Sequence, residues 1–134
     1  MKKIIAGLMI AAAALSFGCG RNAEFGVVDM KKVETEAVAV KTTKEDATKK
    51  LKELDAEMQK ALEGKSQEEG MKIVEDYRAK AKLIQSEASN KMKSSLDTAL
   101  SQVAKEKNLG AILIKQVVPQ GGTDVTKEVI EKMK

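Results

Sequence analysis

Residues 31–63 decide the fold; they read KKVETEAVAVKTTKEDATKKLKELDAEMQKALE. Small or apolar residues recur in this stretch at alternating steps of four and three, with Lys44 as the one polar member: Val33, Ala37, Val40, Lys44, Ala47, Leu51, Leu54, Met58 and Ala61. Such an alternation over about four heptads is typical of a coiled-coil helix. The spacing predicts one helix of about 32 residues, or ~48 Å at ~1.5 Å per residue.

A second long helix is predicted to run from Ser66 to about Lys107. Gly64 suits the end of the first helix, and Ser66 with Glu69 forms a capping box that starts the second. Near residues 88–92 the heptads give way to steps of four, a stutter that locally unwinds a coiled coil and permits bending. At about 42 residues and ~63 Å this helix exceeds the first, so its excess should pack against another element.

The segments that flank the two helices predict a small sheet. Residues 25–28 are a short apolar run ahead of Asp29, a residue that suits a helix N-cap. Residues 111–114 are typical of a buried strand. Residues 116–120 are predicted to return beside it as a second strand, followed by a turn at Gly121-Gly122.

A short terminal helix, residues 127–133, is expected after Thr126 as its cap. The predicted fold class is therefore α+β, with a long antiparallel coiled-coil helical hairpin that projects from a small β-rich body. The hairpin forms an arm at residues 33–103, and the body takes residues 24–32 and 104–134. The predicted strands are too few to stabilise a sheet alone, so we expect their edges to pair between chains.

The composition argues against an enzyme and against metal or nucleic-acid binding. The 134 residues include 33% charged and 2% aromatic side chains, no His and one Cys. This removes the commonest general base and the commonest metal ligand. Without Lys2 and Lys3, 22 of the 24 basic side chains remain against 20 acidic ones, with no basic stripe and no set of aromatics for stacking on bases. We therefore expect no catalysis, no cofactor, no metal and no nucleic-acid partner.

Residues 1–18 are predicted to be a secretory signal peptide, because Lys2 and Lys3 precede an apolar run that is too short to span a membrane. Cys19 follows at once. It is either removed with the leader or becomes the lipidated first residue of a bacterial lipoprotein, and its placement favours lipidation. Residues 15–19 resemble a lipobox, although Ser16 stands where a branched apolar residue is usual.

Three features follow one another in the exported part, residues 19–134. FGVVDMKKV occupies residues 25–33, the charged helical arm comes next, and KEKNLGAILIKQVVPQGGTDVTKEVIEKMK closes the chain at residues 105–134. In the ending, Asp124-Val125-Thr126 opens the last helix. On these motifs and their order, this part of the chain resembles the Skp/OmpH family of periplasmic chaperones.

The resemblance implies a homotrimer in which the small body is the trimerisation unit and the helical arms surround a cavity. It also implies the function, an ATP-independent holdase that keeps unfolded outer-membrane proteins from aggregating in the periplasm. A lipid on Cys19 would anchor such a chaperone to a membrane, facing the periplasm. The residues alone leave open an alternative, a structural envelope lipoprotein whose coiled coil serves as a spacer or tether.

Side chains near the middle of the chain are candidates for contact with such clients. Met71 lies beside the predicted turn, and methionine is a soft, adaptable contact residue. The other candidates are cations on the second helix: Lys72, Arg78, Lys80 and Lys82. Charged residues on a helix face are more often only solvated, so each cation carries that simpler interpretation as well.

Overall fold

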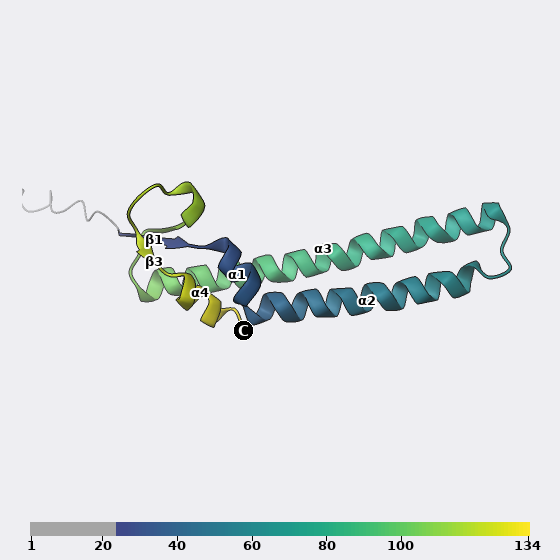
Figure 1. Ribbon diagram of the computed structural model, residues 1–134, viewed down its shortest axis with the longest axis horizontal. Coiled ribbons are helices and arrows are strands. Elements are labelled where there is room, and N and C mark those ends of the chain that lie inside the picture. The colour runs from purple at the N-terminus through teal and green to yellow at the C-terminus, as the bar shows by residue number, and fades with distance from the viewer. Residues whose placement is uncertain (1–23) are drawn as a thin grey trace, which may run out of the picture.

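The computed structural model describes residues 24–134, and the predicted signal peptide and Cys19 lie outside this range. Figure 1 shows a base of short elements at one end, from which two long helices extend side by side. The elements of the described chain, in order, are β1 (Phe25–Val28), α1 (Met30–Glu36), α2 (Val38–Leu62), α3 (Gln67–Glu106), β2 (Ala111–Ile114), the 3-10 turn η1 (Lys115–Val117), β3 (Thr123–Asp124) and α4 (Thr126–Lys132).

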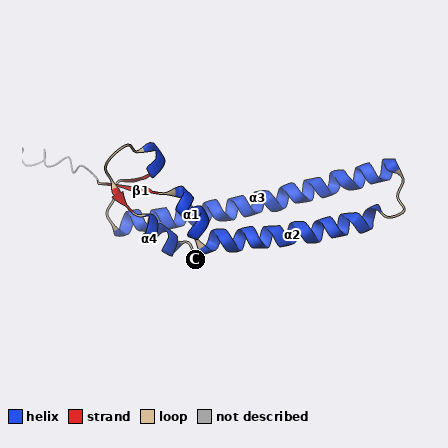
Figure 2. Ribbon diagram, viewed as in Figure 1, coloured by secondary structure: helices blue, strands red, loops and turns tan. Residues whose placement is uncertain are grey.

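The predicted fold class is wrong. Within residues 24–134 the chain is 74% helical, with four helices and a small three-stranded parallel sheet, so its base is not β-rich (Figure 2). The dominant element is a single helix of 40 residues, α3, and the structure does not show the long coiled-coil hairpin on a β body that the heptads predicted. The heptads describe which residues are apolar, but not where a helix breaks or how many short elements pack at its end.

The first predicted helix is divided at Ala37. This residue has an extended backbone, with φ −65° and ψ 127°, and it separates the seven residues of α1 from the 25 of α2. Neither Gly nor Pro is present at the break, so the local sequence does not predict that the helix ends there. Asp29 caps α1 as predicted, since its carboxylate accepts hydrogen bonds from the backbone N–H groups of Lys31 and Lys32.

The sheet has the order β2-β1-β3, and both outer strands run parallel to β1. The strand predicted at residues 116–120 is absent from the described chain, because the segment after β2 forms the turn η1 instead. The chain then crosses over β1 and reaches its far side as β3. Parallel neighbours need such a crossover, whereas the predicted return beside β2 required an antiparallel pair.

α3 returns alongside α2 after a short turn, and the two helices contact each other along their length (Figure 1). The turn was predicted correctly: Gly64 has a φ of 70°, and Ser66 with Glu69 makes the capping box. Most residues along the seam are only partly buried, and the fully buried ones lie near the base, at Val40 and Thr43 of α2 and at Ala99 and Val103 of α3. The outer part of the α2–α3 pair therefore buries little apolar area.

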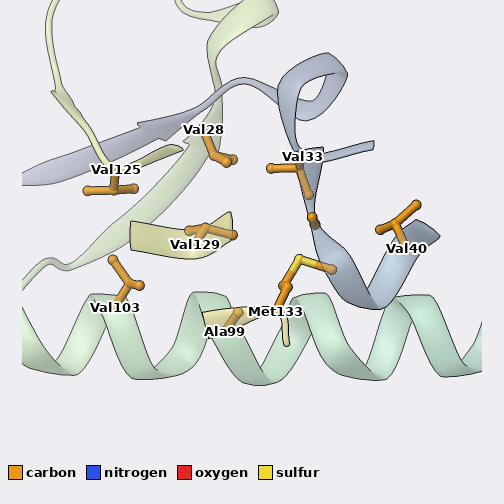
Figure 3. Packing of buried hydrophobic residues seen from close by; sticks show 9 residues of the cluster. Val28, Val33, Val40, Ala99, Val103, Val125, Val129 and Met133 are labelled. Carbon is orange, nitrogen blue, oxygen red and sulfur yellow. The ribbon is translucent and has the colours of Figure 1, made fainter. Parts of the chain in front are cut away.

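The core lies where the short elements meet the inner ends of the long helices (Figure 3). Its members come from six elements or their flanks: Val28, Val33, Ala37, Val40, Ala99, Val103, Val125, Val129 and Met133. Met133 is the largest side chain among those that are fully buried, at 1% exposed. Because valine and alanine dominate, each member contributes only about 1–2 kcal/mol through burial, and the base depends on all of them together.

Gly122 offers a sharp test of how the loop from β2 to β3 packs on the sheet. A Cβ at Gly122 would lie 2.6 Å from Phe25 Cε2 and 2.8 Å from Val27 Cγ1, whereas at Gly121 its nearest neighbour would be 3.7 Å away. Both glycines have positive φ values, 85° and 91°. We expect Gly121→Ala to lower the free energy of unfolding by about 1–2 kcal/mol through backbone strain alone. Gly122→Ala should cost about 1–3 kcal/mol more, because the methyl group overpacks the loop.

Urea denaturation of the two variants side by side checks this prediction. Equal losses would contradict the close packing of the loop on Phe25 and Val27.

Candidate functional site

The base holds a polar network that joins the two ends of the described chain. Asp124 Oδ2 accepts a hydrogen bond from Lys115 Nζ at 2.7 Å, and Asp124 Oδ1 accepts from the Thr126 hydroxyl at 2.6 Å and from the Thr126 N–H at 3.0 Å. The Thr126 oxygen accepts in turn from the Asp29 N–H at 2.9 Å, and Gln116 Nε2 donates to Asp29 Oδ1 at 3.0 Å. Thr126 is thus the first residue of α4 and a bridge to α1, whereas the sequence predicted it as a cap.

The network shifts the ionisation of its charged members. The hydrogen bond from Lys115 holds the pKa of Asp124 well below its ordinary value, and the two hydrogen bonds from Thr126 lower it further. The Asp124 carboxylate raises the pKa of Lys115 for the same reason. About half of each side chain is exposed, at 52% for Lys115 and 48% for Asp124, so solvent screens the ion pair and its net contribution is small.

The Asp124 interactions predict a loss of stability in acid. Because its pKa is lower in the folded than in the unfolded chain, Asp124 stabilises the fold fully above its unfolded pKa of about 3.9, and this contribution fades as the pH falls toward the folded pKa. Asp124→Asn should cost about 1 kcal/mol at pH 7, since the amide keeps one acceptor oxygen. The difference from the unmodified protein should shrink steadily between pH 5 and pH 2.

Urea midpoints at a series of pH values measure this difference. Asp97→Asn removes a carboxylate from the exposed face of α3, outside the network, and should leave the profile unchanged. A constant difference at every pH would show that the Asp124 charge plays no part in stability.

A second feature of the base is an exposed apolar edge. β2 pairs with β1 on one side only, and its register places Leu113 beside Val27 and Ile114 beside Val28. Val27 and Val28 are buried, but Leu113 is 43% exposed, Ile114 47% and Val117, in η1, 73%. We call Leu113, Ile114 and Val117 the β2 edge surface. Within residues 24–134 nothing covers this surface, and the outward N–H and C=O groups of β2 have no strand partner.

The predicted client contacts lie at the opposite end of the molecule, where α3 begins. Met71, Lys72 and Arg78 share one open groove of 790 Å³, whose apolar lining includes Leu62 and Val74. Met71 is 67% exposed, so the structure places it outside the helix seam. The structure thus brings three of the five predicted residues together around one groove of mixed apolar and charged lining.

The remaining two candidates lie outside this groove. Lys80 Nζ lies 4.6 Å from the centre of the Tyr77 ring, a cation–π contact that fixes the lysine against its own helix. Lys82 is exposed on α3, next to Leu83, which is 60% exposed. Neither residue joins a common site with Met71.

Sequence reasoning missed two residues that hold the network, because Lys115 falls between the two predicted strands and Gln116 at the start of the second. It also took residues 111–114 as buried. Residues 111–114 are apolar at four successive positions, and the chain has few other strands. This pattern does indicate that both faces of the strand must pack against other elements that cover them. The sequence does not say that this cover is missing from the chain itself.

The described residues contain no group of three or more His, Cys, Asp or Glu side chains arranged to hold a metal ion. None of the helices in residues 24–134 is long and apolar enough to cross a membrane. No protein-family model matches the chain, and no curated protein matches it significantly.

Proposed function

We propose that this protein is an ATP-independent holdase chaperone of the periplasm, which binds unfolded outer-membrane proteins and prevents their aggregation. The observation that carries the proposal is the β2 edge surface at the root of the α2–α3 pair. Leu113 and Ile114 leave apolar area and a free strand edge in water, and a second copy of the chain is the partner that would cover both.

Association at the base would give the assembly its shape. If three copies join through their bases, three α2–α3 pairs extend from one body and flank a common space. The exposed surface of α2 and α3 is mainly charged, with scattered apolar side chains such as Met71, Leu83 and Val38, at 67, 60 and 56% exposed. Such a surface suits many weak contacts with an unfolded chain better than one tight contact with a folded partner.

The groove around Met71 is the part of this surface where apolar contact is most concentrated. Leu62, Val74 and Met71 offer apolar area, and the groove is also lined by two cations and two acids, Lys72, Arg78, Glu68 and Glu75. The outer end of each α2–α3 pair therefore has the composition expected of a surface that binds unfolded clients weakly and adaptably. This supports the proposed role of the three candidates that the groove unites.

The primary experiment measures light scattering after an outer-membrane porin is diluted from urea, with and without the protein. Suppression of scattering at a molar excess of trimer over porin, without added ATP, is the expected result. Unchanged scattering at a several-fold excess would end the chaperone proposal and leave the spacer or tether as the better account. Sedimentation equilibrium of the protein alone separately tests the trimer.

Export and anchoring are part of the proposal and have their own test. We expect palmitate supplied to growing cells to label the protein at Cys19, and Cys19→Ala to remove the label. A Cys19→Ala chain that stays fully labelled would exclude the anchor, without bearing on the chaperone activity of the exported domain.

A further inference from the structure

The break between α1 and α2 is imposed from outside the helix. Residues 30–62 contain neither Gly nor Pro, and Ala37, at the break, is the strongest helix former of all residue types. The contact at the break comes from the far end of the chain, because the Ala39 N–H donates a hydrogen bond to the Met133 carbonyl at 3.1 Å. The Met133 side chain is buried in the same core as Val33 and Val40 (Figure 3).

The hydrogen bonds around Ala37 show what the break replaces. A continuous helix would direct the Ala39 N–H to the Thr35 carbonyl and the Val40 N–H to the Glu36 carbonyl. In the structure the Ala39 N–H donates to the Met133 carbonyl instead. The N–H groups of Val40 and Lys41 both donate to the Ala37 carbonyl, at 3.2 Å each. Within residues 24–134 the Val38 N–H donates no backbone hydrogen bond across the break. In the bent form, a hydrogen bond to Met133, just after α4, therefore replaces a helical hydrogen bond that this sequence is able to make.

From this we infer that the Ala37 break is a two-position joint, which the C-terminal segment latches in its bent form. When Met133 leaves its site, α1 and α2 join into one continuous helix. α2 is held along α3 by the seam between them, so α1 is the part that moves, together with β1, which only Asp29 separates from it. This movement takes Val33 out of the core and uncovers Val125 and Val129. The Met133 contact therefore controls whether the apolar interior of the base is exposed to solvent. This inference does not depend on the proposed function.

A proline at Val38 separates the two positions of the joint. Position 38 is the first residue of α2, where proline fits, and Ala37 already has the extended backbone that proline requires of the residue before it. Val38 is 56% exposed, so its replacement removes little packing. In the continuous helix the same proline would lie in the interior, where its ring clashes with the preceding turn. Val38→Pro is thus compatible with the bent form alone.

The experiment uses spin labels at Lys31→Cys on α1 and Lys52→Cys on α2, in a Cys19→Ser chain diluted with unlabelled protein. A continuous helix would separate the two backbones by ~32 Å, that is ~1.5 Å for each residue between them. The bent form, in which α1 meets α2 at a steep angle, gives a shorter distance (Figure 1). We expect one short distance in the parent and a second population near the longer value in Met133→Ala. Adding Val38→Pro should abolish that second population.

Two outcomes would overturn the inference: no long-distance population in Met133→Ala, or one that persists when Val38→Pro is added. The melting temperature of Val38→Pro alone gives a test that does not rely on the Met133 variant. It should equal or exceed that of the parent. Thr42→Pro, an exposed position four residues further into α2, is the matched control and should melt several degrees lower. A similar fall in both proline variants would show that the joint has no preformed bend.

Discussion

Replacing Leu113 by aspartate is expected to separate the chains and to abolish suppression of porin aggregation. Leu113 is 43% exposed on the β2 edge surface and lies beside Val27 in the register of the sheet. If a second chain covers this edge, the new carboxylate is buried without a partner, at a cost of about 3 kcal/mol for each interface. This corresponds to about 100-fold weaker association. Sedimentation should then show the monomer at concentrations where the unmodified protein is assembled.

Leu83→Asp is the matched control for this prediction. Leu83 is also an exposed leucine, at 60%, but it lies on α3 away from the sheet edges. Its replacement introduces the same negative charge as Leu113→Asp and leaves the β2 edge intact, so assembly should persist. Helix content by circular dichroism should stay the same in both variants, since neither leucine belongs to the core. Dissociation of both variants, or of neither, would contradict the assignment of the β2 edge as the contact between chains.

The sequence predicted best those elements whose ends are capped by their own side chains. Asp29 begins α1, and Ser66 with Glu69 begins α3, because these side chains accept hydrogen bonds from backbone groups within three residues of themselves. The turn at Gly64 follows from its positive φ, which glycine adopts without strain. These signals are local, so they need no knowledge of the rest of the fold.

The features that sequence reasoning missed depend on contacts between distant parts of the chain. The helix breaks at Ala37 because Met133 bonds to Ala39, and nothing between residues 31 and 63 records that contact. β3 consists of only two residues, Thr123 and Asp124, of which aspartate is disfavoured in strands, and they pair with β1 because the loop has crossed over it. The heptad spacing could not distinguish one long helix from two that share an apolar face.

The candidate site, too, has features that the sequence suggested and features that it could not predict. The sequence offered Met71, Lys72 and Arg78 separately, from their residue types and their place on the second helix, and it did not predict that they line a single groove. The network around Asp124 could not be foreseen, because Asp29 is far in sequence from Thr126 and Gln116, to which it bonds, and these residues meet only after the sheet forms. The exposure of Leu113 was equally hidden, since an apolar strand has the same composition whether its cover comes from its own chain or from another copy.

Met133→Ala is expected to lower the free energy of unfolding by about 2–5 kcal/mol. Met133 is 1% exposed, the largest of the fully buried side chains, and it lies among Val33, Val40 and Ala99 of three different helices (Figure 3). Truncation removes the transfer free energy of the side chain. It also leaves a cavity that small neighbours such as Ala99 cannot fill by changing rotamer.

Met71→Ala provides the comparison, because the same substitution is made at a residue that is 67% exposed. It should change the free energy of unfolding by less than about 0.5 kcal/mol. Urea denaturation must be run at one protein concentration for all variants, since the proposed association of folded chains would add to their apparent stability. If Met133→Ala cost no more than Met71→Ala, Met133 would not be part of the core, and α4 would have to hold the base together through its other residues. If the cost is large in Met133→Ala alone, the end of the chain is what fixes α1 and α2 to the sheet.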